Sequence, residues 1–169
     1  MRMELCQFCL KSGMLCSKCK KKVEKGEVTE LDIKIGRLLM SIEDEYPPLQ
    51  DVYLYKAVEA NGVLAIFVGQ GDIAKILSYG GKIVRFLERK TKKTIRVLEN
   101  NSNERKFLED LFAPMDVLTI NRIWLPDGTT ETRVILRGRE KKRASKYINA
   151  LKEIAKKAQG LTLRVEFAA

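Results

Sequence analysis

The stretch GQGDIAKILSYGGKIVRFLERKTKK, residues 69–93, decides how this chain folds. Apolar residues recur at helical spacing on both sides of Ser78-Tyr79-Gly80-Gly81, so the pattern predicts a helix over 73–77, a glycine turn and a helix over 82–93. Such a turn lets the backbone approach a phosphate group, and the N-terminus of the second helix adds N–H donors. Positive charge gathers beside it, on Lys82, Arg85, Arg89, Lys90, Lys92 and Lys93. The stretch therefore predicts a phosphate-binding turn, although a plain corner between two helices stays open as the alternative.

Strands are predicted on either side of this stretch. Two apolar runs, 52–60 and 63–68, flank Asn61-Gly62, the strongest short signal for a hairpin. A β-branched run at 94–98 follows the second helix and predicts a third strand. Together these elements form one small α+β unit.

A similar series follows later in the chain. Runs 117–125 and 130–136 predict two strands around Pro126-Asp-Gly128, a helical apolar stripe ends before Gly160, and residues 161–167 alternate as a final strand. The sequence thus contains an internal repeat of hairpin, helix and strand with a period of about 60 residues. Tandem units are more common in binding proteins than in single-site enzymes, because two weak contacts on one chain combine into avidity.

Two further helices are predicted from their caps. Thr29-Glu-Leu-Asp32 has the form of a capping box, and Pro47-Pro48 ends the segment that it opens. The apolar stripe of this amphipathic helix is formed by Leu31, Ile35, Leu38, Leu39 and Ile42. Asn103 can cap a short helix that stops near Pro114.

All four cysteines lie within the first 19 residues, as Cys6-Gln-Phe-Cys9 and Cys16-Ser-Lys-Cys19. A two-residue gap lets each pair wrap one ion from a tight turn, and two pairs complete a tetrahedral zinc site. Four thiolates leave no position for water, so the expected cofactor is one structural zinc ion. A redox pair is the alternative, but the lysines around the motifs and the lack of a strand–helix context favour the metal. Since the chain has no histidine, a mixed cysteine–histidine site and an imidazole base are excluded.

The charge of the chain indicates an anionic partner. Its 32 basic and 22 acidic residues leave a net charge of +10. Residues 1–26 carry seven basic and two acidic groups, residues 27–60 carry three and eight, and the remainder is again basic. Nucleic acid is favoured over membrane, because no helix combines a basic face with a broad aromatic apolar face. Charge that serves only solubility is the alternative.

The sequence indicates neither a membrane protein nor an enzyme. The N-terminus lacks the apolar run of a secretory signal, and no stretch approaches the roughly 18 apolar residues that span a bilayer, which predicts a cytoplasmic protein. No paired carboxylates with a matching base stand out, and Gly69-Gln-Gly71 is not followed by the Lys-Ser/Thr of a nucleotide-binding loop. We therefore expect a protein that binds without turnover and has no small-molecule substrate. A zinc hydrolase is a distant alternative.

Several motifs together resemble the archaeal NusA-like proteins. They are the Gly71-Asp72 step into a helix, the Ser78–Gly81 turn, Leu87-Glu-Arg-Lys90, Phe112-Ala-Pro114 and the Pro126-Asp-Gly128 hairpin. The resemblance runs from about residue 50 to the end, and the cysteine module is similar to the zinc-bearing version of the group. It implies two tandem type II KH domains in a factor of transcription elongation or termination, whose GxxG turn holds single-stranded RNA. The family turn usually reads glycine-lysine-glycine-glycine, so serine at position 78 predicts a retained but weakened grip.

The second repeat has no matching turn. Where the turn would lie, the chain reads RGREKKR, residues 137–143, with a single glycine. Its basic residues can contact phosphates by charge alone, or they form only a solvated face. The candidates for RNA contact here are Arg137, Gly138, Arg139, Lys141, Lys142, Arg143 and Lys146. Tyr79 and Trp124 are the aromatic residues most open to base stacking, although a lone tryptophan in a strand is more often core.

The predicted fold class is α+β, with two tandem type II KH-like domains after a small zinc module. The expected parts are the zinc module over 1–26, an amphipathic linking helix over 27–48, a first KH-like domain over 49–112 and a degenerate second one over 113–169. Single-stranded RNA is the expected partner, and the contacts expected in the first domain are Ser78, Tyr79, Gly80, Gly81, Lys82, Arg85 and Arg89. RNA polymerase is a further partner if the protein acts in transcription. The alternative is a ribosome-associated or ribosome-assembly factor whose zinc module docks protein.

Overall fold

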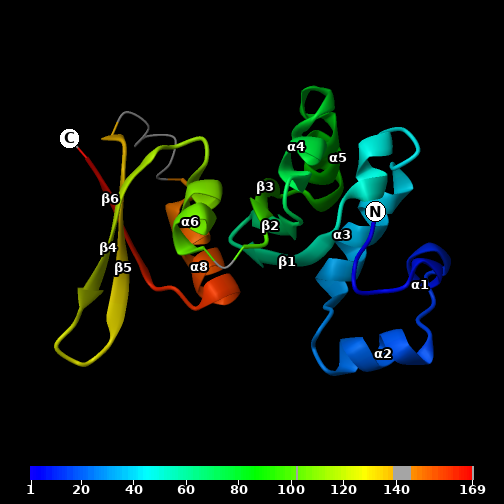
Figure 1. The fold of residues 1–169 in the computed structure, drawn as a ribbon, viewed down its shortest axis with the longest axis horizontal. Coiled ribbons are helices and arrows are strands. Elements are labelled where there is room, and N and C mark those ends of the chain that lie inside the picture. The colour runs from blue at the N-terminus through cyan, green and yellow to red at the C-terminus, as the bar shows by residue number, and fades with distance from the viewer. Residues whose placement is uncertain (102, 139–145, 169) are drawn as a thin grey trace. The chain divides into compact units, whose positions relative to one another are not determined.

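The computed structural model describes residues 1–101, 103–138 and 146–168 and shows a mixed α+β protein (Figure 1). The chain divides into two compact units, Met1–Ala57 with Ala65–Asn100, and Val58–Leu64 with Asn101–Ala169. The described strands form two three-stranded sheets. Among the helices of the described residues, none is both long and apolar enough to cross a membrane.

The first unit begins with three helices, α1 (Gln7–Ser12), α2 (Ser17–Glu24) and α3 (Glu30–Ser41). The predicted capping box is confirmed, because Thr29 Oγ1 accepts the N–H of Asp32 at 3.1 Å and Asp32 Oδ2 accepts the N–H of Thr29 at 3.0 Å. Helix α3 ends at Ser41, and the proline pair lies in the short 3₁₀ helix η1 (Pro47–Asp51). The sequence pattern does not predict α1 and α2, because both are too short to show an apolar stripe.

The N-terminal segment packs against α3 and the start of the first hairpin. Arg2 forms an isolated parallel bridge with Tyr53. Gly36 of α3 lies so close to this segment that an added Cβ would be 2.6 Å from Met3 Sδ. Met1, Met3, Leu5 and Leu10 are buried. The N-terminal segment and Leu10 of α1 are therefore part of the same core as the rest of the first unit, whereas the only buried residue of α2 is Cys19.

The first sheet has the strand order β1 (Leu54–Ala60), β2 (Val63–Val68) and β3 (Thr94–Glu99). Asn61 and Gly62 join β1 to β2 with φ angles of 45° and 84°, as a tight two-residue hairpin requires. All six residues of the central strand β2 are buried. Between β2 and β3 lie α4 (Asp72–Leu77) and α5 (Lys82–Thr91), separated by the 3₁₀ turn η2 (Tyr79–Gly81). The helix–turn–helix predicted from residues 69–93 is confirmed.

The second unit repeats this order of elements. It contains α6 (Glu104–Phe112), β4 (Val117–Trp124), β5 (Thr130–Leu136), α8 (Ile148–Gln159) and β6 (Leu163–Phe167). The central strand β5 is antiparallel to β4, with Ile120 opposite Val134, and parallel to β6, with Val134 opposite Val165. Asn103 caps α6 by accepting the N–H of Lys106 at 3.1 Å, as expected. Since β4 begins 63 residues after β1, the predicted repeat is present in the strands of both sheets.

The expectation that Trp124 belongs to the core is wrong. Its side chain is 74% exposed at the end of β4, where it pairs with Thr130 next to the turn. The alternation of a strand shows which residues share a face, but it does not show whether a helix covers that part of the face. The sequence pattern therefore could not show whether a helix covers the end of the hairpin that carries Trp124.

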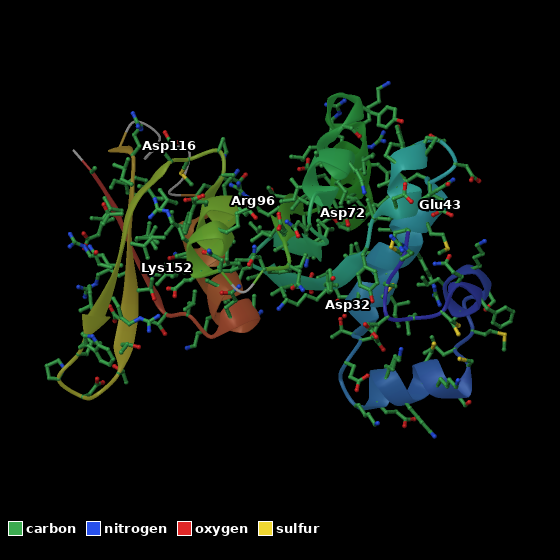
Figure 2. All side chains as sticks on the ribbon, viewed as in Figure 1. Asp32, Glu43, Asp72, Arg96, Asp116 and Lys152 are labelled. Atoms are coloured by element: carbon green, nitrogen blue, oxygen red, sulfur yellow. The ribbon has the colours of Figure 1, made fainter. Side chains whose placement is uncertain are left out.

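Asp32 ties α3 to β1 (Figure 2). Its carboxylate is only 3% exposed, and Oδ1 accepts the N–H of Ala57 at 2.7 Å while Oδ2 caps the helix.

Asp32→Ala is expected to lower the free energy of unfolding by about 2–3 kcal/mol, because it leaves two backbone N–H groups without an acceptor. Urea denaturation followed by circular dichroism measures the change. The matched control is Glu30→Ala, an exposed acid in the same helical turn, for which we expect less than about 1 kcal/mol. Equal losses in the two variants would contradict this role.

Candidate functional site

The turn between α4 and α5 has three consecutive residues in the left-handed region. The φ angles are 56° at Tyr79, 62° at Gly80 and 80° at Gly81. Ser78 has a φ of −67°, so its position does not require glycine, and its hydroxyl donates to the Lys75 carbonyl at the end of α4. The backbone strain lies instead at Tyr79, because a residue with a side chain is disfavoured at positive φ.

The backbone of this turn is accessible. Gly80 is exposed, and an added Cβ would meet no atom within 4 Å. At Gly81 the nearest atom to such a Cβ is Arg85 Nη1, at 3.6 Å. Gly81 is also the N-cap of α5, and no side chain caps this helix. The turn therefore presents small residues beside the positive end of a helix dipole, where an anion binds favourably.

Asp72 holds the start of α4 and so the position of the turn (Figure 2). The buried carboxylate accepts the N–H of Tyr53 at 2.9 Å and that of Gly69 at 3.1 Å through Oδ2, and it forms an ion pair with Lys75 at 3.0 Å through Oδ1. Gly69 allows this approach, because an added Cβ would lie 2.7 Å from Asp72 Oδ2. The sequence marks Asp72 only as part of a glycine–aspartate motif and does not show that it is buried.

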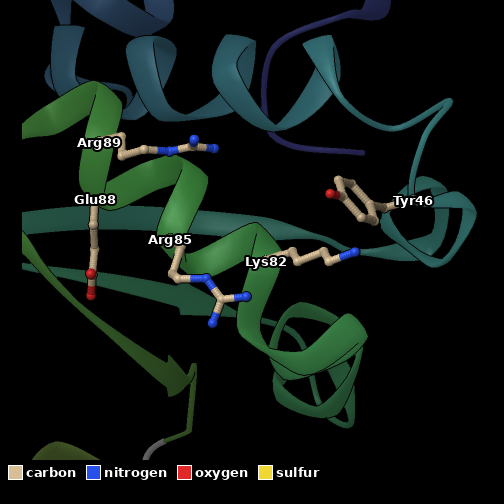
Figure 3. A pocket seen from close by; sticks show the side chains of 5 residues that line it. All are labelled: Tyr46, Lys82, Arg85, Glu88 and Arg89. Atoms are coloured by element: carbon tan, nitrogen blue, oxygen red, sulfur yellow. The ribbon is translucent and has the colours of Figure 1, made fainter.

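A cavity of about 560 Å³ lies beside the turn (Figure 3). It is lined by Tyr46, Lys82, Arg85, Glu88 and Arg89. The structure thus brings three of the predicted basic residues together along one side of α5. Tyr46, between α3 and η1, was missed by the sequence analysis, because nothing in its local sequence links it to residues more than thirty positions later.

The predicted contacts of the second repeat are described only in part. Arg137 forms an exposed ion pair with Asp116 at 3.0 Å, and Lys146 Nζ lies 5.5 Å from the centre of the Tyr147 ring. Gly138 is half-buried. Arg139, Lys141, Lys142 and Arg143 lie outside the described residues. The described part of this stretch therefore has local partners and forms no turn like that of the first repeat.

The four cysteines lie together as predicted. In each pair the first cysteine is the N-cap of a short helix and the second is its third residue, so both side chains lie at the same helix end. The Sγ atoms of Cys6, Cys9, Cys16 and Cys19 all lie within 4.8 Å of one another. A tetrahedral ion with metal–sulfur bonds of about 2.3 Å places its sulfur ligands about 3.8 Å apart, so the cluster can hold one metal ion after small adjustments.

Hydrogen bonds connect the four cysteines and shift their pKa values in opposite directions, down at Cys6 and Cys16 and up at Cys9 and Cys19. The backbone N–H of Cys16 donates to Cys9 Sγ at 3.1 Å. Bonds from the Cys19 backbone and the Cys9 thiol lower the pKa of Cys16 to about 6, which favours the thiolate form that binds metal. Cys9 and Cys19 are buried, whereas Cys6 is exposed. The cluster therefore lies at the surface with half of its ligands shielded from water.

Comparison with known proteins gives information on the fold alone. No protein-family model matches the sequence, and no curated protein matches it. Sixty-eight chains of solved structures do match. One of them, the crystal structure of APE1850, superposes with a TM-score of 0.57 and 18% sequence identity, over 78% of this chain and 96% of that one. At this identity the likeness concerns the arrangement of the backbone only.

Proposed function

We propose that this protein binds single-stranded RNA through the turn at Ser78–Gly81, as a NusA-like factor in transcription. The observation that carries the proposal is the accessible backbone of Gly80 and Gly81 at the start of α5, with Lys82, Arg85 and Arg89 on the same helix. The small residues let the sugar-phosphate chain come close, and the cations and the helix dipole stabilise its charge. Binding is the function, without turnover.

In this proposal each repeat is a KH-like domain. Two consecutive units with the same order of helix, hairpin, helix and strand support a tandem arrangement. The first domain supplies the turn that holds the phosphates. The second domain, which lacks such a turn in its described part, contributes charge rather than specific contacts.

The cysteine cluster is proposed to hold one structural zinc ion. Its ligands would be Cys6, Cys9, Cys16 and Cys19, whose four soft sulfur atoms leave no open coordination position. The ion would supply cohesion to a segment that has two helices of only six and eight residues. Such short helices are marginal in water without a cross-link.

A titration of single-stranded RNA tests the proposal. Fluorescence anisotropy of a labelled ten-nucleotide uridine RNA is expected to show binding that weakens with salt, with a logarithmic slope of about −0.7 for each phosphate contacted. Gly80→Asp together with Gly81→Asp is expected to weaken binding about 100-fold, because two carboxylates repel the phosphates where the turn meets them. Aspartate tolerates positive φ better than most residues, Gly80 has open space, and at Gly81 the nearest atom lies at an ordinary contact distance of 3.6 Å, so the fold should persist.

The matched control is Gly62→Asp together with Gly128→Asp. These glycines also have positive φ, 84° and 89°, with nothing within 4 Å of an added Cβ, but they lie in the hairpin turns. The control should bind RNA within about twofold of the unchanged protein. Loss of affinity in both double variants, or in neither, would exclude the turn as the binding site.

A ribosome-associated role is the second candidate. It is favoured by two large apolar side chains beside the cysteine cluster, Phe8 and Met14, which are 69% and 74% exposed and suit a protein contact. Cofractionation decides between the two. Sedimentation with ribosomal subunits would support the second candidate, and copurification with RNA polymerase would support the first.

A further inference from the structure

The cavity beside the turn is connected to it by an aromatic pair. The rings of Tyr46 and Tyr79 lie with their centres 4.9 Å apart at an angle of 65°, an edge-to-face contact. Tyr79 belongs to the turn and remains 43% exposed. Tyr46 lines the cavity, and in Figure 3 the Lys82 side chain extends toward its ring. An RNA chain that crosses the turn would therefore meet an aromatic surface next to it.

The charge of the cavity is positive. Lys82, Arg85 and Arg89 line it, and none of the three takes part in the ion pairs of the described residues. The one acid of the lining, Glu88, extends in a different direction from Lys82 and Arg89 in Figure 3. Its Oε1 instead accepts the N–H of Ile95, on β3, at 3.5 Å. Three cations without a counter-ion repel one another, so an anion placed among them is stabilised.

We propose that this cavity is a nucleotide subsite of the RNA-binding surface, which takes one phosphate on Arg85 and Arg89 and places the attached base against Tyr46. The inference rests on the proposed function and adds to it a position beyond the glycine turn. The volume of about 560 Å³ lies within the range of sites for small organic ligands, and one nucleotide fits it. Aromatic rings accept any base, so the subsite adds affinity rather than sequence preference.

The aromatic part is tested on the full chain with the same labelled uridine RNA. Tyr46→Ala is expected to weaken binding about tenfold through lost stacking, and Tyr46→Phe, which keeps the ring, is expected to restore most of it. The control is Tyr55→Ala, which removes an exposed tyrosine on β1 outside the cavity and should leave the affinity unchanged. Circular dichroism checks that each variant is folded.

The cationic part is tested by the salt dependence. Arg85→Gln together with Arg89→Gln is expected to reduce the logarithmic salt slope by about 0.7, the value for one phosphate on a single strand. Both arginine side chains are exposed, so this double variant is expected to stay folded. It therefore tests the subsite even if Tyr46→Ala unfolds the protein. Lys152→Gln together with Lys156→Gln on α8 removes the same charge as a control and should change the slope less.

The outcomes separate the subsite from the RNA-binding function. If the unchanged protein binds no RNA, the proposed function itself is wrong. If it binds RNA through Gly80 and Gly81, but neither the Tyr46 variant nor the double arginine variant alters affinity or slope, the subsite is wrong. Uridine monophosphate serves as a competitor. If uridine monophosphate displaced the RNA when the two were present at equal concentration, the cavity would be a site for a free nucleotide. That result would overturn the assignment to an RNA chain.

Discussion

Removal of the proposed zinc ion is expected to unfold the segment over residues 6–24 while the first sheet stays folded. Apparent zinc-binding energies in small four-ligand modules are about 10–16 kcal/mol, far more than helices of six and eight residues can gain by themselves. The purified protein should contain one zinc ion per chain, measured by mass spectrometry of the metal. Chelation, or Cys9→Ser, should abolish amide protection in α1 and α2 and leave that of β2 intact, since β2 has its own buried core.

A control variant and two contrary results test the structural role of the metal. Ser17→Ala changes an exposed residue between the ligands and should retain zinc and protection. Protection of α1 and α2 that survives complete removal of metal would contradict a structural role. Rapid conversion of the four thiols into two disulfides in the native protein would instead support the redox alternative.

Replacement of Asp72 by alanine is expected to lower the free energy of unfolding of the first unit by about 3 kcal/mol. The substitution leaves the Tyr53 N–H buried without an acceptor, and it removes charge-assisted bonds to Gly69 and Lys75. Asp72→Asn keeps an oxygen for the backbone donors and loses only the ion pair, so we expect about 1 kcal/mol. Amide exchange of β2 under native conditions measures both values.

A double-mutant cycle with Gly69 tests the geometry behind this expectation. Gly69→Ala alone should destabilise the unit by about 1–3 kcal/mol, because its Cβ would lie 2.7 Å from Asp72 Oδ2. In the Asp72→Ala background the same change should have almost no effect, since the atom that it meets is gone. Additive losses would show that Gly69 is required for some other reason. Asp44→Ala, at an exposed position, is the control for loss of an acid.

Local signals account for most of the secondary structure. Asn61-Gly62, the Thr29 capping box and the Asn103 cap all have the expected geometry, because a turn or a cap depends on a few neighbouring residues. The short helices α1 and α2 gave no such signal. The exposure of Trp124 was not predictable either, since it depends on where the helices of the second unit end.

The two candidate sites also combine features that local sequence predicts with contacts that it does not predict. Cysteine spacing alone located the four-cysteine cluster, because the two residues of a CxxC pair lie close enough to face one ion. Glycines and nearby cations located the turn. Burial of Asp72 and the contact of Tyr46 with Tyr79 came only from the coordinates, because each joins residues separated by many positions along the chain.

The order of residues was thus sufficient for the elements of the repeat, the cysteine cluster and the glycine turn, since each of these is encoded within short windows of sequence. Folding in three dimensions selected which cations share a cavity, which aromatic ring lies beside them and which carboxylates are buried. These features arise when Tyr46, between α3 and η1, lies beside α5 and when Tyr53, just before β1, meets Asp72 of α4. Packing between distant segments depends on the whole core, and no short window of sequence contains that information.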